Sequence, residues 1–127
     1  MDYIDSCILW DWSVYGEYSK YIAGAVQGRG ACTSVFALLE LRFSLVRKGV
    51  LKDLAAQYIE KIALKSGITI LPGSAQDVLD AFALESCGLQ LYDSLHAAIC
   101  LRNNYRMATA DKDFDKVRKL EVFVPPK

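Results

Sequence analysis

Residues 91–114 read LYDSLHAAICLRNNYRMATADKDF and contain the most specific pattern of the chain. The first part predicts a helix over residues 93–102, because an acid stands at its start and apolar residues follow at helical spacing. Residues 105–109 predict a strand, and residues 111–119 a short helix. A succession of helix, strand and helix is typical of a parallel sheet whose connections cross over its faces.

The same alternation extends over the rest of the chain. Capping residues and glycines bound several apolar segments, with Thr33 or Ser34 ahead of one helix and Gly49 after it. The sequence therefore predicts an α/β fold, a three-layer α/β/α sandwich with a central, mostly parallel sheet. The remaining strands are expected at residues 3–4, 31–33, 68–71 and 122–124, and the helices at 10–21 with an interruption, 35–48, 51–66 and 74–87.

Composition is that of one ordinary globular domain spanning residues 1–127. The chain has 53% apolar and 24% charged residues, with 15 basic against 15 acidic side chains, which argues against disorder. Its apolar runs are far shorter than the roughly 18 residues of a membrane span, and its first residues are acidic where a secretory signal would be basic. We therefore expect a cytoplasmic protein without a membrane segment, whose four scattered cysteines are reduced thiols.

Three aspartates stand where predicted elements begin or end. Asp5 ends the first predicted strand, Asp93 begins a helix, and Asp111 follows the strand over residues 105–109. Ligands of open parallel sheets gather at the carboxyl ends of the strands, so these acids are candidates for a binding site. Each of them could equally be only a helix cap that meets the positive end of the helix dipole.

Glu40 is the acid that is hardest to explain by capping. It lies in a predicted helix that is apolar nearly all round, and its neighbours three and four positions on are Phe43 and Ser44, not cations. A carboxylate in such surroundings is costly unless positive charge meets it. A bound metal ion could supply that charge, or a distant side chain such as Arg42 or Arg102 could.

Four segments of the chain closely resemble a PIN-domain protein of the VapC toxin type. In that family an acid ends the first strand, another lies on the helix after the second strand, a third opens a later helix, and a fourth follows the fourth strand. The least similar region is residues 10–30. The segments are Tyr3-Ile4-Asp5-Ser6, Thr33-Ser34 ahead of Glu40, residues 92–98 (YDSLHAA) and residues 108–114 (ATADKDF).

The resemblance implies a metal-dependent endoribonuclease that hydrolyses RNA, usually a homodimer and usually held inactive by a small antitoxin. Asp5, Glu40, Asp93 and Asp111 occupy the four family positions in order and are the expected catalytic residues and ligands of Mg²⁺ or Mn²⁺. Such hard ions take oxygen ligands, and one or two of them lower the pKa of an attacking water and neutralise charge on a phosphodiester.

Several residues near these acids have two interpretations. Hydroxyl groups there could hydrogen-bond a carboxylate or a metal-bound water, or only cap helices. The sole histidine, His96, lies one turn after Asp93 and could act as an acid or base, but a structural role is favoured. Asp113 and Asp115 are interpreted as solvated acids that could support the site. The candidate supporting residues are Ser6, Thr33 and Thr109.

Basic side chains concentrate between residues 42 and 65, although the net charge is zero. Arg47 and Lys48 in this belt are candidate RNA-binding residues, and a solvated helix face is the alternative. The aromatic residues between Trp10 and Tyr21 could stack bases, but packing against the core or a partner is the favoured interpretation.

Two rival functions follow from the same pattern. Doubly wound folds with an aspartate after the first strand also carry out phosphoryl transfer through an aspartyl phosphate. Glu40 in an apolar helix, and the lack of a lysine ending a later strand, argue against that reading. The other rival is a catalytically inert PIN-like module that binds RNA or protein, although all four acids are present.

Overall fold

The computed structural model describes residues 1–127 and is built on a five-stranded parallel sheet. The strand order is β3-β2-β1-β4-β5, so β1 lies at the centre and the order reverses there. All neighbouring pairs are parallel, which confirms the predicted fold class. The strands are β1 (Asp2–Ile4), β2 (Ala31–Ser34), β3 (Thr69–Leu71), β4 (Arg106–Ala108) and β5 (Val122–Phe123).

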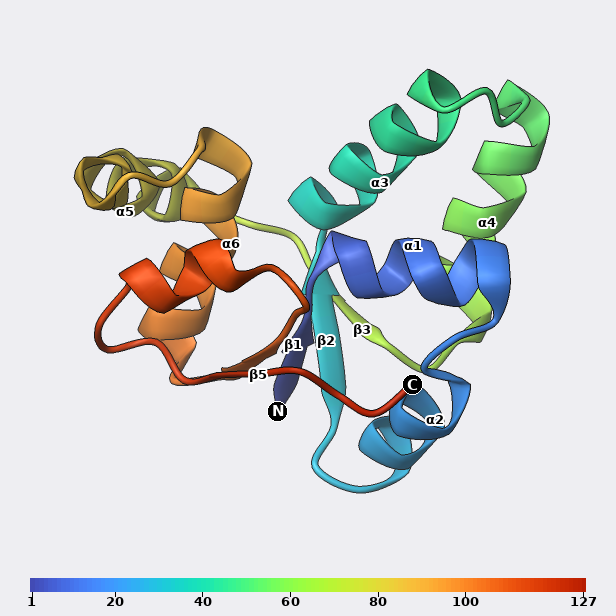
Figure 1. Cartoon of the computed structure of the whole chain (residues 1–127), viewed down its shortest axis with the longest axis horizontal. Helices are drawn as coiled ribbons and strands as arrows, with labels where there is room; N and C mark the ends of the chain where they lie inside the picture. Colours follow the sequence, from blue (N-terminus) through green and yellow to red (C-terminus); the bar gives the residue numbers. More distant parts are fainter.

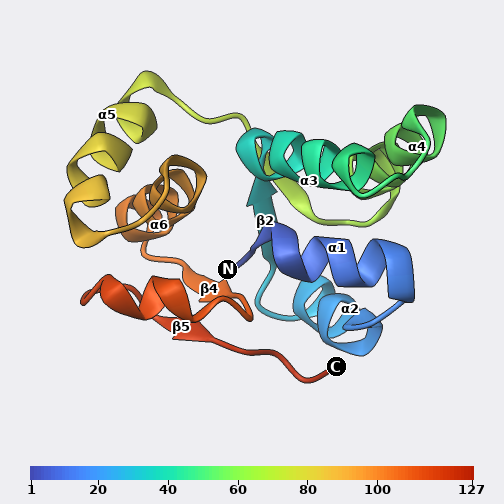
Figure 2. The same cartoon turned by 45° about the horizontal axis from the view of Figure 1, so that its top comes forward.

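Helices cover both faces of this sheet (Figures 1 and 2). One layer holds α1 to α4, and the other holds α5, α6 and two 3₁₀ turns, η1 and η2. No helix combines the length and apolarity that crossing a membrane needs. The helices are α1 (Ser6–Tyr15), α2 (Ser19–Gln27), α3 (Val35–Arg47), α4 (Lys52–Lys65), α5 (Ala75–Leu84), η1 (Glu85–Cys87), α6 (Leu91–Asn103) and η2 (Lys112–Lys116).

Alternation along the short strands divides the core between the two layers. Ile4 and Ala31 are buried in the cluster beneath α1 to α4, whereas Tyr3 and Cys32 are buried in the cluster beneath α6 and η2. Successive strand residues point to opposite faces, so both faces of the central strands are fully covered. The sheet is therefore buried on both sides, as all-parallel sheets are.

The structure differs from the predicted boundaries in three places. Helix α6 begins at Leu91, so Asp93 lies in its first turn and does not start it. The helix expected over residues 111–119 is only the 3₁₀ turn η2. The helices of the aromatic stretch extend beyond residues 10–21, since α1 begins at Ser6 and α2 ends at Gln27. The predicted interruption is present, where Gly16 and Tyr18 adopt left-handed backbone conformations.

The aromatic side chains of this region pack on the core, as the favoured interpretation predicted. Tyr18 is buried, and Trp10, Trp12 and Tyr21 lie partly buried against the α1–α4 cluster. Tyr15 is the exception, with 68% of its surface exposed.

The amino-terminal edge of the sheet is held by an ion pair between the buried Asp2 and the partly exposed Arg106. Asp2 accepts hydrogen bonds from Arg106 Nε at 3.1 Å and Nη2 at 3.0 Å, and from the Tyr21 hydroxyl at 2.7 Å. The Arg106 guanidinium also lies 3.8 Å from the centre of the Phe123 ring. Burial alone would raise the pKa of Asp2, but the hydrogen bonds from Arg106 and Tyr21 outweigh it and lower that pKa. This cluster joins β1, β4 and β5 at the edge opposite Asp5.

We predict that Asp2→Asn lowers the free energy of unfolding by about 3 kcal/mol, because it leaves Arg106 without its partner charge. Since the folded-state pKa lies below the ordinary 3.8, the ionised group stabilises the fold above that pH, and its contribution disappears as the pH falls through the folded-state value. Urea unfolding at several pH values measures this loss.

The matched control is Glu60→Gln, which removes an exposed acid of α4. Equal stability of the Asp2→Asn and Glu60→Gln proteins at neutral pH would contradict the role of the Asp2 cluster.

Candidate functional site

Asp5 stands directly after the central strand and is fixed from two sides. Its Oδ1 accepts the Ser6 main-chain N–H at 2.8 Å, as the N-cap of α1. Its Oδ2 accepts the Thr109 hydroxyl at 2.7 Å, and Thr109 Oγ1 in turn accepts the Asp111 N–H at 3.0 Å. Asp5 and Asp111 are thus placed side by side at the carboxyl ends of β1 and β4.

Glu40 points from the middle of α3 toward the same edge of the sheet. Its Oε1 accepts a short hydrogen bond from the Ser6 hydroxyl, and lies 2.9 Å from His96 Nε2 on α6. The suggested partners Arg42 and Arg102 are wrong: Arg102 pairs with Asp77 at 3.1 Å, and the side chain that Glu40 meets is the imidazole of His96.

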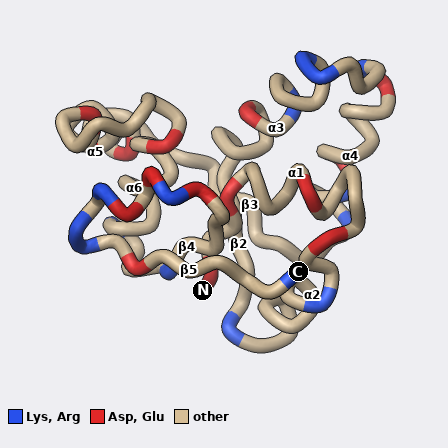
Figure 3. The backbone as a smooth tube through the Cα atoms, in the orientation of Figure 1, with Lys and Arg blue, Asp and Glu red and all other residues tan.

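The candidate ligand atoms form two adjoining groups. Within each group they lie within 4.8 Å of one another: Asp5, Glu40 and His96 form the first, and Asp93, Asp111 and Asp113 the second. The negative charges of Asp5, Asp111 and Glu40 all act on Asp93, so the two groups are close enough to interact. Acidic positions from separate parts of the chain accordingly gather near the ends of the central strands (Figure 3). The four acids expected from the sequence therefore come together.

Asp93 is the acid whose ionisation is most strongly disfavoured. Burial, followed by the charges of Asp5, Asp111 and Glu40, raises its pKa from 3.8 to about 6. Mutual repulsion of this kind is expected where carboxylates converge without a cation between them. The site therefore holds unfavourable charge that a bound cation would relieve.

His96 and Glu40 shift one another's pKa in the directions expected of an ion pair. Burial disfavours the charged imidazole, but the hydrogen bond to Glu40 and the charges of Asp5, Glu40 and Asp93 outweigh burial and raise the pKa of His96. Burial likewise opposes ionisation of Glu40, yet its hydrogen bonds with His96 and Ser6 lower its pKa. Glu40 is therefore an ionised acceptor at neutral pH.

Two of the three expected supporting hydroxyl groups contact the acids. Ser6 donates to Glu40, and Thr109 donates to Asp5. The expectation for Thr33 is wrong: its hydroxyl is buried and donates to the main-chain oxygen of Ile4 at 2.8 Å, so it ties β2 to β1.

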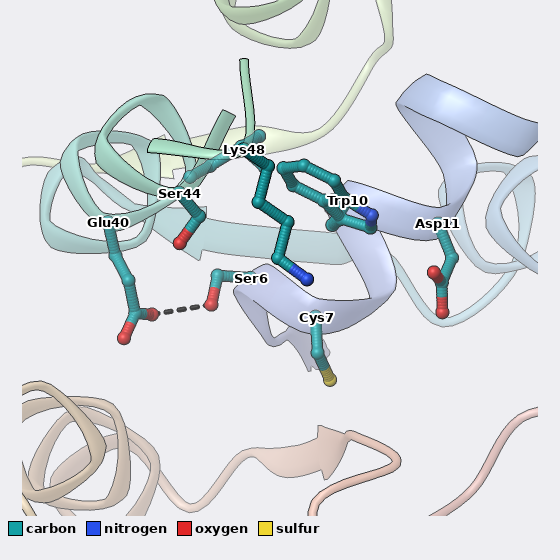
Figure 4. Close-up of a pocket in the computed structure, with 8 residues that line it drawn as sticks. Ser6, Cys7, Trp10, Asp11, Glu40, Ser44 and Lys48 are labelled. Atoms are coloured by element: carbon teal, nitrogen blue, oxygen red, sulfur yellow. Dashed lines mark hydrogen bonds between the residues drawn. The ribbon is translucent and has the colours of Figure 1, made fainter. Parts of the chain in front are cut away.

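A cavity of about 300 Å³ adjoins Glu40 between α1 and α3 (Figure 4). Lys48 and Trp10 line it together with Ser6, and the Lys48 ammonium lies 5.5 Å from the centre of the Trp10 ring. Figure 4 shows the Lys48 side chain passing along Trp10 with its ammonium on the side of Ser6. Arg47, the other candidate RNA-binding residue, does not line this cavity.

Two features of the site were not predicted from the sequence: the contact of His96 with Glu40, and the place of Asp113 beside Asp93 and Asp111. A structural role is favoured for His96, although its position one turn after Asp93 already places both residues on one face of α6. Asp113 is interpreted as a solvated acid; it is indeed exposed, but it lies with Asp93 and Asp111, where its main-chain N–H donates to Asp111 Oδ1 at 2.9 Å. Asp115 is not part of either group.

The donor set fits a hard divalent cation. Carboxylates from four separate elements supply the oxygen atoms that Mg²⁺ and Mn²⁺ prefer. Carboxylates that converge on one another, with the pKa of one raised to about 6, are the electrostatic setting in which such a cation binds favourably. Residues Asp5, Glu40, Asp93 and Asp111 could hold it, with Asp113 at the exposed side.

We predict that Asp93→Asn raises the melting temperature in chelator at pH 7.5. Its folded-state pKa of about 6 lies above the ordinary 3.8, so ionisation of Asp93 lowers stability as the pH rises through this interval, and asparagine removes that loss. In wild type, Mn²⁺ at ten times its Kd should add roughly 3 to 6 °C. The variant should gain less, as thermal melts with chelator and with Mn²⁺ would show.

Asp115→Asn provides the control, since Asp115 lies on η2 outside both groups. Equal metal-induced shifts in wild type and Asp93→Asn would mean that Asp93 does not contribute to a metal site.

Several solved structures share the fold of this chain. A chain of VapBC2 from Rickettsia felis, solved bound to a promoter DNA fragment, superimposes with a TM-score of 0.78 at 19% identity, and the match covers 98% of each chain. VapC20 of Mycobacterium tuberculosis, described as a sarcin-ricin loop cleaving toxin, gives 0.74 at 15% identity, with 96% of this chain and 98% of that one covered. VapBC-1 of nontypeable Haemophilus influenzae gives 0.71 at 20% identity, with 98% of each chain covered.

A comparison with curated protein sequences finds no match. The PIN domain family model, however, matches residues 3–120, which include all four converging acids. Because that match covers nearly the whole sequence, the chain belongs to the PIN domain family.

Proposed function

We propose that this protein is a Mg²⁺- or Mn²⁺-dependent endoribonuclease and the toxin of a toxin–antitoxin pair. The observation that carries the proposal is the convergence of Asp5, Glu40, Asp93 and Asp111 at the carboxyl ends of the central strands. Residues 1–127 would act as one PIN domain in the cytoplasm. PIN domain membership and the VapC-type fold support the same conclusion.

A bound divalent cation would lower the pKa of an attacking water and neutralise charge that develops on the phosphodiester. The protein's own contribution is to hold the acids in place. Thr109 and the Ser6 N–H fix both oxygens of Asp5, and Ser6 and His96 fix Glu40. Because those partners are themselves buried or half-buried, the ligands need little rearrangement when metal and RNA arrive.

The related complexes suggest the partners. Solved relatives include VapBC pairs from R. felis and H. influenzae and a toxin–antitoxin complex from Klebsiella pneumoniae, which supports a small antitoxin for this chain. RNA as the substrate is supported by VapC20, a toxin that cleaves the sarcin-ricin loop. A homodimer is proposed from the family resemblance.

We predict that the purified protein cleaves single-stranded or loop RNA in Mn²⁺ and is inactive in chelator. Asp5→Asn and Glu40→Gln should each reduce the cleavage rate roughly 100-fold or more, because each removes a ligand charge from the centre. Gel assays with a labelled RNA measure the rate, and circular dichroism checks that each variant is folded. Glu60→Gln is the control and should keep full activity.

Full activity in chelator would contradict the metal-dependent mechanism. Tight RNA binding by wild type without cleavage in Mn²⁺ would favour the inert PIN-like module. A trapped phosphate on Asp5 would favour the phosphotransferase.

The basic end of α3 gives the RNA a second point of contact. Lys48 lines the same cavity as Glu40 and Ser6, with its ammonium on the side of Ser6, so an RNA strand that passes Glu40 would meet this ammonium with a phosphate. Arg47 is its neighbour at the turn between α3 and α4, where Figure 3 shows basic positions together. Both side chains are proposed to meet RNA phosphates.

We predict that Lys48→Ala and Arg47→Ala each weaken RNA binding and flatten its salt dependence. For a single-stranded RNA, the removal of one phosphate-binding cation should reduce the slope of log K against log salt by about 0.7. Fluorescence anisotropy at several salt concentrations, in an Asp5→Asn background that prevents cleavage, measures the slope.

Lys20→Ala removes an exposed lysine of α2 and is the matched control. A slope unchanged by Lys48→Ala would assign Lys48 to a solvated helix face.

A further inference from the structure

A chain of buried hydrogen bonds runs from the protein core to Glu40. The Ser34 and Tyr3 hydroxyl oxygens are 2.7 Å apart, and the Tyr3 hydroxyl lies 2.7 Å from His96 Nδ1. His96 Nε2 then lies 2.9 Å from Glu40 Oε1. Ser34, Tyr3 and His96 are all completely buried, so no solvent can take the place of a missing partner in this chain.

These hydrogen bonds can run in one direction in which every hydrogen has an acceptor. Ser34 Oγ accepts the Ala37 N–H at 3.3 Å, and the Tyr3 oxygen is the acceptor within reach of its own hydrogen. Tyr3 then donates to His96 Nδ1, and His96 Nε2–H donates to Glu40. Burial raises the pKa of Tyr3 well above its ordinary value, so Tyr3 keeps the hydrogen that this direction requires.

The reverse direction leaves groups unsatisfied. Ser34 would accept from Tyr3 and from Ala37, and its own hydrogen would have no acceptor. Nε2 would also present a lone pair to the Glu40 carboxylate across 2.9 Å, which is a repulsive contact. If Nδ1 is protonated as well, the Tyr3 hydroxyl accepts from Nδ1 and donates to Ser34 instead. Nε2 of the imidazolium still carries its hydrogen and donates it to Glu40.

We infer that His96 is a positioning residue for Glu40: its Nε2–H holds Oε1, so that Oε2 is the oxygen offered to a cation, and Nε2 itself is not a metal ligand. The part of this inference that concerns a cation rests on the proposed function. The assignment of a hydrogen to His96 Nε2 does not depend on that function.

The geometry at Glu40 explains why a second donor matters. Ser6 Oγ and His96 Nε2 both donate to Oε1, and no hydrogen bond reaches Oε2. A glutamate side chain has three rotatable bonds, and two donors on one oxygen restrict them to one orientation. His96 therefore lies close enough to count among the candidate ligands, yet its lone pair is not available to the metal.

The first experiment locates the hydrogen directly in the wild-type protein. His96 is the only histidine, so labelling histidine with ¹⁵N gives a spectrum of this one ring. Nuclear magnetic resonance between pH 6 and 8, without and with Mg²⁺, should show Nε2 protonated throughout. A hydrogen on Nδ1 alone, or loss of the Nε2 hydrogen when Mg²⁺ binds, would overturn the inference.

The second experiment asks whether His96 acts through Glu40. Isothermal titration calorimetry with Mn²⁺ should show His96→Phe binding about tenfold or more weakly than wild type, because the ligand Glu40 no longer has its outer partner. His96→Gln, whose amide can donate to Oε1, should bind within about threefold of wild type. In a Glu40→Gln background, His96→Phe should have no further effect; an equal loss in both backgrounds would overturn the inference.

The experiments distinguish failure of the proposed function from failure of the His96 assignment. If the protein does not cleave RNA or bind Mn²⁺, yet Nε2 is protonated, the proposed function fails and the hydrogen-bond assignment to Glu40 stands. If it cleaves RNA while Nε2 lacks its hydrogen, only the assignment of His96 fails. Should His96→Phe not fold, the spectrum of the wild-type protein still decides.

Discussion

Repulsion between carboxylates at one edge of a parallel sheet is the constraint on which the rest of this structure depends. The connections of a parallel sheet bring the ends of β1 and β4, the first turn of α6 and the middle of α3 to one place. These acids are too buried and too close together for water to stabilise all of their charges. The raised pKa of Asp93 shows that its ionisation is unfavourable there. Hydroxyl groups, a main-chain N–H and one imidazole hold the acids in place instead.

At the opposite edge of the same sheet, a buried carboxylate is stabilised by partners within the protein. There Asp2 is paired with Arg106 and Tyr21, and its pKa is lowered. The two ends of β1, only three residues long, thus carry acids in opposite electrostatic situations. One end contributes stability, and the other keeps its charge available for a ligand, which is the usual division between structural and functional parts of a fold.

Sequence patterns predicted the parallel sheet, because capping residues, glycines and short apolar segments act locally. The set of four acids came from the resemblance to the PIN-domain family, since each acid by itself could have been a helix cap. Contacts between distant elements were harder to predict. Glu40 is recognisably unusual within its helix, yet its partner His96 lies on another helix, and the suggested arginines were wrong. The prediction for Thr33 was wrong for the same reason. The register of β1 against β2 decides whether its hydroxyl contacts a carboxylate or a main-chain carbonyl.

Ser34 makes two contacts that connect the protein core to the site. Its hydroxyl accepts the Ala37 N–H as the N-cap of α3, the helix that carries Glu40, and it also begins the chain through Tyr3 to His96. One side chain therefore governs both where the backbone of Glu40 sits and how its carboxylate is turned. A side chain that replaces Ser34 would have to fit a fully buried position, cap α3 and meet the Tyr3 hydroxyl at once, so few substitutions are compatible with this place in the core.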